Sequence, residues 1–315
     1  MSDRILYRLV ATRYRQALLS LLSLGSVAAT WGFWIEPASL HNATYRLELP
    51  RWPSTCRGLR VAVLADLHTG SPFNGLDKLD EIVALTQKAK PDLVLLAGDY
   101  VIDGVKGGRF VPPREIAARL ARLTAPLGTY AVLGNHDWWN GAGKVRTAFT
   151  GAGIPVLDDR AVPLAKGACR FWLVGFADLW EGNPDVRRAL REVPPGATVL
   201  AFTHNPDIFP AVPAKVALTV AGHTHGGQVR VPFYGPIITP SRHGRRYARG
   251  HIIENGRHLF VSPGLGTSIL PVRFLVPPEV SVLRLYDSPA PAMKSRQMHS
   301  STAGIAHGSA PIRVM

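Results

Sequence analysis

The stretch from residue 130 to residue 137 reads YAVLGNHD, an apolar run that ends in Gly134, Asn135, His136 and Asp137. A short apolar run followed at once by a glycine predicts a buried strand and a tight turn. Four other runs, VAVLAD, LVLLAGD, VLAFTH and LTVAGHTH, have the same form, and the polar residues at or just after their ends are Asp66, His68, Asp99, His204, His223 and His225. Five predicted strands therefore each deliver at least one side chain that can bind a metal ion.

Strands and helices alternate along most of the chain. The sequence predicts strands at residues 60–65, 93–97, 130–133, 171–176, 199–202, 217–220, 259–261 and 280–285. Apolar residues at helical spacing predict helices around residues 76–86 and 116–123. This order indicates an α/β fold in which helices cover the sheet. Ligands of such folds bind at the carboxyl ends of the strands, so the five polar groups are expected to converge on one site.

The types of residue at this site favour particular metals. Carboxylate, imidazole and amide ligands without a thiolate suit Mn, Fe(II), Co or Zn. Two such ions about 3.5 to 4 Å apart can hold a hydroxide and stabilise both the attacking and the leaving oxygen of a displacement at phosphorus. Asp99, in the turn Gly98-Asp99, is placed to bridge two ions. The sequence therefore predicts a two-metal site for phosphoryl chemistry.

Taken together, these motifs resemble the calcineurin-like metallophosphoesterase superfamily, whose pattern runs D-x-H, G-D, G-N-H-[DE], H, G-H-x-H. The resemblance extends over residues 59–286. The strings GFADLW at 175–180, HNPD at 204–207 and GHTHGGQVRVP at 222–232 are similar to a bacterial membrane-associated phosphodiesterase branch. The resemblance implies a sandwich of two β-sheets flanked by helices and a hydrolase that depends on a dinuclear metal centre.

The resemblance also implies a role for each motif residue. Asp66, His68 and His225 would bind the first metal, Asn135, His204 and His223 the second, and Asp99 would bridge them. His136 would contact the scissile phosphate and protonate the leaving oxygen, a role that suits the side chain that titrates nearest neutral pH. A third metal ligand is the alternative for His136.

One departure from the superfamily concerns the residue that orients this histidine. Larger phosphoprotein phosphatases continue G-D-Y-V-D-R-G, and the aspartate of that string orients the histidine. Here the corresponding acid is shifted by one position, to Asp103. Asp103 and Asp137 are both candidates for the orienting residue, and both are also explained as polar loop residues.

The N-terminus carries a membrane-targeting signal. Residues 1–16 contain four arginines, and residues 17–35 are apolar and almost uncharged. We expect an uncleaved single-pass anchor rather than a cleaved signal peptide or a buried core helix, with an aromatic interface at Trp31, Phe33 and Trp34.

The predicted organisation is an anchor at 1–35, a linker at 36–58, a catalytic domain at 59–287 and a disordered tail at 288–315. Arginines before the anchor favour a periplasmic catalytic domain at a bacterial inner membrane.

Charge and cysteine content say little about the partners of the protein or its compartment. A net charge of +14 favours an anionic partner, although dispersed arginines also fit an ordinary solvated surface. The two cysteines, Cys56 and Cys169, suggest neither a disulfide framework nor a cysteine-based zinc site. The redox compartment is therefore left open.

Three functions are compatible with these observations. The favoured one is hydrolysis of a phosphodiester or pyrophosphate bond in a small anionic substrate, and the resemblance points to a lipid-linked one such as a nucleotide-diacylglucosamine. Residues 265–275 could then accept an acyl chain or simply pack. A nuclease or nucleotide phosphodiesterase is the second, although only residues 242–249 approach a basic groove, so nucleic acid is not expected as a partner. A membrane-tethered binding protein would require a lost metal ligand, and none is lost. We expect a monomer.

Overall fold

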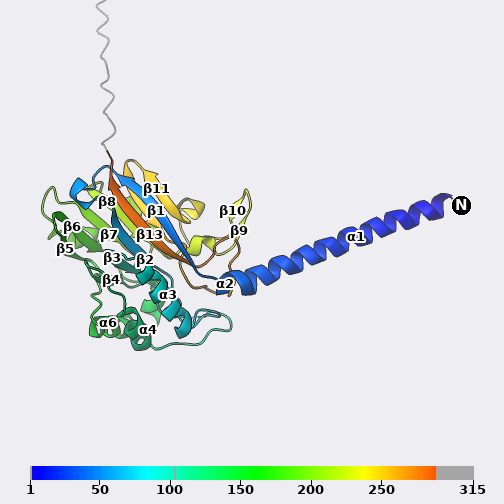
Figure 1. Ribbon diagram of the computed structural model, residues 1–315, viewed down its shortest axis with the longest axis horizontal. Helices are drawn as coiled ribbons and strands as arrows, with labels where there is room; N and C mark the ends of the chain where they lie inside the picture. Colours follow the sequence, from blue (N-terminus) through cyan, green and yellow to red (C-terminus); the bar gives the residue numbers. More distant parts are fainter. Residues whose placement is uncertain (1, 103, 289–315) are drawn as a thin grey trace, which may run out of the picture.

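Two β-sheets pack face to face, with helices on their outer faces (Figure 1). The computed structural model describes residues 2–102 and 104–288. The first sheet has the order β1-β13-β2-β3-β4, and its strands are β1 His41–Leu49, β2 Leu59–Leu64, β3 Leu93–Ala97, β4 Thr129–Val132 and β13 Glu279–Asp287. β13 pairs parallel with β1 and antiparallel with β2, while β2, β3 and β4 run parallel.

The second sheet has the order β11-β12-β8-β7-β6-β5. Its strands are β5 Arg160–Lys166, β6 Cys169–Gly175, β7 Val199–Phe202, β8 Val216–Ala221, β11 Gly250–Glu254 and β12 Arg257–Val261. The four central strands are parallel, and both edge strands are antiparallel to their neighbours. A separate hairpin, β9 Arg230–Val231 and β10 Gly235–Pro236, lies outside both sheets.

Apolar side chains form three layers because each sheet is covered on both faces. Between the sheets, residues such as Val61 and Leu95 share one buried core with Leu200 and Phe202. A second core lies under α3 Leu76–Lys88, α4 Pro113–Leu120 and α6 Ala142–Gly151, on the outer face of the first sheet. The third core covers the second sheet with α7 Val186–Ala189 and the 3₁₀ turns η3 Pro206–Ala211 and η5 Gly244–Tyr247. The two-sheet α/β sandwich is confirmed.

All eight predicted strands are present, and five others were not expected. The unexpected ones are β1, β5, β9, β10 and β11. β1 lies within residues 36–58, so the prediction of a linker there is wrong. It is an edge strand whose outer half is exposed, and it pairs along its whole length with β13. Its apolar signal is weak because only its last residues reach the core.

The N-terminal segment is helical. It comprises α1 Ser2–Thr30, a π-helical turn η1 Trp31–Ile35 and α2 Glu36–Ala38. Residues Tyr7–Ala38 form one continuous helix that is long and apolar enough to cross a bilayer by length and composition. It extends away from the domain (Figure 1), with little of its surface buried, which argues against a core helix. The predicted tail from residue 289 onward lies outside the described residues, as does Asp103.

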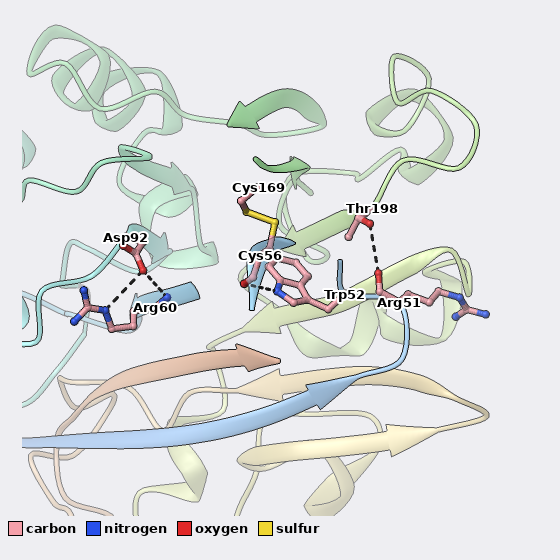
Figure 2. Close-up of a disulfide and its surroundings, with 7 residues drawn as sticks. All are labelled: Arg51, Trp52, Cys56, Arg60, Asp92, Cys169 and Thr198. Atoms are coloured by element: carbon pink, nitrogen blue, oxygen red, sulfur yellow. Dashed lines mark hydrogen bonds and ion pairs between the residues drawn. A yellow bond between two sulfur atoms is a disulfide. The ribbon is translucent and has the colours of Figure 1, made fainter. Parts of the chain in front are cut away.

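A disulfide joins Cys56 to Cys169, and the expectation of no disulfide is wrong (Figure 2). Cys56 ends the 3₁₀ turn η2 Ser54–Cys56, and Cys169 begins β6, so the bond ties the lead-in to β2 to the second sheet. Buried Trp52 lies beside it, donates a 3.0 Å hydrogen bond from Nε1 to the Cys56 carbonyl, and packs against Phe171. A sequence separation of 113 conceals this pairing, because only the fold brings the two Cα atoms to 4.6 Å.

Candidate metal centre

The structure brings all eight predicted site residues together at the carboxyl ends of five parallel strands. Asp66 and His68 follow β2, Asp99 follows β3, and Asn135 and His136 begin α5 Asn135–Trp139 just after β4. His204 follows β7, while His223 and His225 follow β8 and lead into the 3₁₀ turn η4 His225–Gly227. All eight side chains are buried. Both sheets therefore contribute to one centre.

One group of possible ligands consists of Asp66, His68 and His225, whose ligand atoms all lie within 4.8 Å of one another. The Nε2 atoms of His68 and His225 face each other at 3.2 Å, and Asp66 Oδ1 lies 3.6 Å from His225 Nε2. The backbone N–H of His223 donates to both oxygens of Asp66, at 2.9 and 3.0 Å, and so fixes this carboxylate.

A second group consists of Asp99, His204 and His223. His204 Nε2 lies 3.2 Å from Asn135 Oδ1 and 3.1 Å from His223 Nδ1. The other ring nitrogen, His204 Nδ1, lies 2.8 Å from the Ala97 carbonyl. A carbonyl only accepts, so Nδ1 donates to it, and Nε2 is the nitrogen that faces the ligand group. Asn135 lies beside this group through its contact with His204.

Asp99 lies between the two groups. Its Oδ2 is 3.6 Å from His68 Nε2 and 3.2 Å from His204 Nε2, while its Oδ1 accepts a 2.9 Å hydrogen bond from the His136 backbone N–H. A Cβ on Gly134 would lie 2.3 Å from Asp99 Oδ1, so the glycine of GNHD allows this approach. The turn therefore directs one carboxylate oxygen toward both ligand groups.

His136 lies at the edge of the centre. It is 9% exposed, the largest value among the eight residues, and its ring meets His68 edge-on with centroids 4.6 Å apart. His68, Asp99 and His136 also form a third group with ligand spacing. Geometry alone thus leaves both roles open for His136, as proton donor or as ligand.

Asp137 has a different task from the orienting role considered for it. Its carboxylate accepts hydrogen bonds from the backbone N–H groups of Asp99 at 2.8 Å, Tyr100 at 2.9 Å and Gly134 at 2.9 Å. Asp137 therefore ties the loop after β3 to the start of α5. The contacts found for its side chain are to backbone, so it positions Asp99 rather than the His136 ring.

Five of the candidate ligands have a left-handed backbone, which is uncommon for residues other than glycine. They are Asp66, His68, Asp99, His223 and His225, with φ between 40° and 71°. Each such residue costs about 1–3 kcal/mol and persists only where its surroundings hold it, most often at ligand sites. The chain therefore accepts local strain to direct these side chains inward.

A family model described as calcineurin-like phosphoesterase matches residues 59–227, which hold all eight site residues. The chain belongs to the calcineurin-like phosphoesterase family. It is a metal-dependent hydrolase of phosphoric esters. The match ends just after His225, so the hairpin β9–β10, strands β11 to β13 and the N-terminal helix lie outside it.

Similar proteins come from several organisms. The metallophosphoesterase YkuE of Bacillus subtilis is 29% identical over 87% of this chain and 96% of its own. The phosphodiesterase YaeI of Escherichia coli is 33% identical over 82% of this chain and 95% of its own. A transmembrane protein with a metallophosphoesterase domain from Danio rerio is 26% identical over 85% of this chain and 62% of its own.

The electrostatics of the phosphoesterase site fit bound cations. Burial lowers the pKa of His68 and His223 to about 3, and that of His225 well below its ordinary value, so these rings are neutral and can bind metal. Burial raises the pKa of Asp66 to about 7. Burial also lowers the pKa of His204, but attraction to Asp99 outweighs it and raises that pKa to about 10. A cation would supply the positive charge that this proton supplies to Asp99.

The ring nitrogens that face one another support the same conclusion. His68 Nε2 lies 3.2 Å from His225 Nε2, and His204 Nε2 lies 3.1 Å from His223 Nδ1. The Asp66 and Asp99 carboxylates lie beside these nitrogens, and so many buried polar atoms turned toward one another need a cation or water among them. The donor set thus fits a metal centre of nitrogen and oxygen ligands.

The phosphoesterase site has neighbours that the motifs did not reveal. Trp139 packs against His136 with ring centroids 4.7 Å apart, and Trp180 meets His223 edge-on at 4.4 Å. Both tryptophans are about half exposed, and Trp139 Nε1 donates to Glu181 at 2.8 Å, so the two side chains flank the centre. The GFADLW string was the signal for Trp180, although nothing in its spacing indicated a contact with His223.

The loop after β12 also supports the site. A Cβ on Gly264 would lie 2.8 Å from Asp66 Oδ2, so this loop packs directly on the first ligand group. Arg273 is completely buried and holds the loop by donating hydrogen bonds to the carbonyls of Pro263 at 3.1 Å, Gly266 at 3.0 Å and Val276 at 2.9 Å. No motif marked Arg273, because its partners are backbone atoms.

Proposed function

We propose that this phosphoesterase uses two divalent metal ions to hydrolyse a phosphodiester or pyrophosphate bond, with a lipid-linked molecule as its substrate. The position of Asp99 carries the proposal, since its Oδ2 faces His68 of one ligand group at 3.6 Å and His204 of the other at 3.2 Å. Asp66, His68 and His225 would hold one ion, Asn135, His204 and His223 the other, and Asp99 would contact both. The donor set favours Mn, Fe, Co or Zn.

Bound metal ions would activate water and neutralise the charge that develops on the phosphoryl oxygens. The chain supplies the remaining functions. His136, at the exposed edge of the centre, is placed to give a proton to the leaving oxygen. Trp139 and Trp180 border the two sides of the site. Asp137 and Arg273 hold the loops around the centre in position through hydrogen bonds to backbone atoms.

Support for a diester or pyrophosphate comes from the phosphodiesterase name of the similar Escherichia coli protein. Support for a lipid-linked substrate comes from the apolar helix Tyr7–Ala38, which would hold the site near a bilayer. A nuclease has less support, because Arg246 of the one basic stretch forms an ion pair with Glu254 and Arg245 stacks on Tyr234. A binding protein without activity has no support, because none of the expected ligand residues is missing.

A substrate panel tests the reaction. The full chain in detergent with added Mn²⁺ should hydrolyse bis(p-nitrophenyl) phosphate and a nucleotide-sugar pyrophosphate faster than p-nitrophenyl phosphate. The half-exposed rings of Trp139 and Trp180 beside the centre can pack against a second substituent on phosphorus. Faster turnover of the monoester would contradict the diester assignment. Degradation of single-stranded DNA above the rate for the small diester would favour the nuclease.

The disulfide supports an extracytoplasmic catalytic domain. Disulfides persist in oxidising compartments and are rare in the cytosol. Four arginines before the apolar run favour a cytoplasmic N-terminus by the positive-inside rule and therefore a catalytic domain on the other side of the membrane. Both observations support the same orientation, with the helix as a single-pass anchor.

Alkylation in intact bacterial cells tests this orientation. Cells are acid-quenched, and the unfolded chain is treated with a maleimide that adds mass. We expect no mass shift before reduction and a shift of two tags after it, because Cys56 and Cys169 are the only cysteines. The variant Cys56→Ser is the control and should take one tag without reduction. Two tags on the unreduced wild-type chain would place the domain in the cytoplasm.

A further inference from the structure

The hairpin β9–β10 and the loop after β12 expose a group of apolar side chains at the end of the domain where the N-terminal helix leaves (Figure 1). Phe233 at the tip of the hairpin is fully exposed, Ile238 is 75% exposed and Ile269 is 73% exposed. We call this group the hairpin surface, and its members are Phe233, Tyr234, Ile237, Ile238, Ile269, Leu270 and Leu275. Exposed apolar side chains gathered on neighbouring segments mark a binding surface rather than ordinary solvent-facing residues.

The hairpin surface has a fixed position relative to the N-terminal helix. The carbonyl of Gly32 accepts a 2.9 Å hydrogen bond from the Arg273 backbone N–H, and Gly32 lies against Val272 and Phe274. The Glu36 carboxylate accepts hydrogen bonds from the backbone N–H groups of Leu275, at 2.9 Å, and Val276. Arg230 N–H in turn donates to the Phe274 carbonyl at 2.9 Å. Helix end, loop and hairpin thus form one continuous assembly.

The connection between the N-terminal helix and the hairpin surface indicates that a lipid bilayer covers this surface. The exposed aromatic residues Trp31, Phe33 and Trp34, at the end of the helix, belong to a residue class that sits at the level of lipid headgroups. If they lie at that level, the hairpin surface beside them reaches the same interface. An apolar surface in this place would be covered by acyl chains without any further partner.

Charges next to the hairpin fit anionic headgroups. The Arg245 guanidinium lies 3.8 Å from the centre of the Tyr234 ring and donates to the Tyr234 carbonyl at 2.7 Å. Within residues 2–102 and 104–288, Arg230, Arg242 and Arg245 form no ion pair with a carboxylate. A hollow of about 400 Å³ lies between Arg230, the hairpin and Leu275. A basic side chain beside an apolar wall suits the phosphate and upper acyl chain of a lipid.

We propose that the hairpin surface inserts into the headgroup region of the bilayer as a second membrane contact, separate from the N-terminal helix. The chain from His225 through Gly226 and Gly227 leads directly into the hairpin, and a Cβ on Gly227 would lie 2.3 Å from the Cβ of Pro236. The contact would hold the His225 edge of the metal centre beside the lipid. Insertion itself does not depend on the proposed substrate, whereas this consequence for access rests on the proposed function.

A fluorescent probe in the full chain tests the insertion. Both native cysteines form the disulfide, so a single added cysteine can be labelled selectively. Phe233→Cys carries the probe at the tip, and Lys215→Cys is the matched control, because Lys215 is exposed and precedes β8 at the end opposite His223. The labelled chains are reconstituted in phosphatidylcholine vesicles with or without phosphatidylglycerol. Lipids with a spin label near the headgroup serve as quenchers.

We expect strong quenching and a blue-shifted emission at position 233, and neither at position 215. The change Arg245→Gln should reduce quenching at 233 only in vesicles that contain phosphatidylglycerol. Turnover of bis(p-nitrophenyl) phosphate reports folding of each labelled chain. Equal quenching at the two positions, or a probe at 233 that stays in water, would overturn the proposal. Loss of quenching with intact diester turnover would contradict the insertion but not the proposed function, so the experiment distinguishes the two proposals.

Discussion

Asp99→Asn should remove bound metal and turnover together, with a rate loss of about 10³-fold or more. Loss of Lewis-acid stabilisation costs several kcal/mol, and each 1.36 kcal/mol is tenfold in rate. Asn keeps the shape of the side chain and an oxygen that accepts from the His136 N–H, so the start of α5 should stay in place. What disappears is the negative charge that faces His68 and His204. Elemental analysis of the purified variant measures the metal content.

The matched control is Asp92→Asn, at the opposite end of β3 from Asp99. Asp92 immediately precedes β3 and Asp99 follows it, and both are buried. Asp92 accepts from the Arg60 N–H at 2.8 Å (Figure 2). It also pairs with Lys166, at the end of β3 opposite the ligand groups. Its variant should melt at a lower temperature yet keep its metal and its turnover. Two equivalents of metal with normal turnover in Asp99→Asn would refute the bridging role.

The residues of the candidate site were easier to predict from the sequence than the surface around it, and the reason is physical. Each ligand lies within four residues of the end of a buried strand, so the local sequence indicates both its chemistry and its place at the sheet edge. His204 was found although it is a lone histidine, because VLAF before it predicts β7. The left-handed backbone at Asp66 and His223 was not predictable, since only the packed loops impose it.

Contacts between distant segments explain what the sequence did not reveal. Cys56 and Cys169 meet only after the sheets have packed. β1 was missed because its partner β13 lies more than two hundred residues later in the chain. β11 was missed although Asn255-Gly256 between it and β12 is a strong hairpin signal. That signal was available from the sequence alone.

His136→Asn should lower turnover by about 10² to 10⁴ on substrates with poor leaving groups while both metals stay bound. An alkoxide leaving group needs a proton near neutral pH, whereas nitrophenolate is stable as an anion. The structure supports a donor role because the His136 ring is the most exposed of the eight and lies between His68 and Trp139. Its Nδ1 has no hydrogen-bond partner among the described residues, which leaves that atom available for a substrate or water.

A series of aryl and alkyl diesters separates this role from that of a ligand. The rate of His136→Asn should depend more steeply on leaving-group pKa than that of the wild-type chain, and the two rates should converge for nitrophenyl esters. His204→Asn is the comparator, because the same substitution there removes a nitrogen that faces Asp99 at 3.2 Å and should lose metal and slow every ester alike. If His136→Asn behaves like His204→Asn, with parallel losses and a lower metal content, then the third ligand group of His68, Asp99 and His136 binds an ion and another residue must supply the proton.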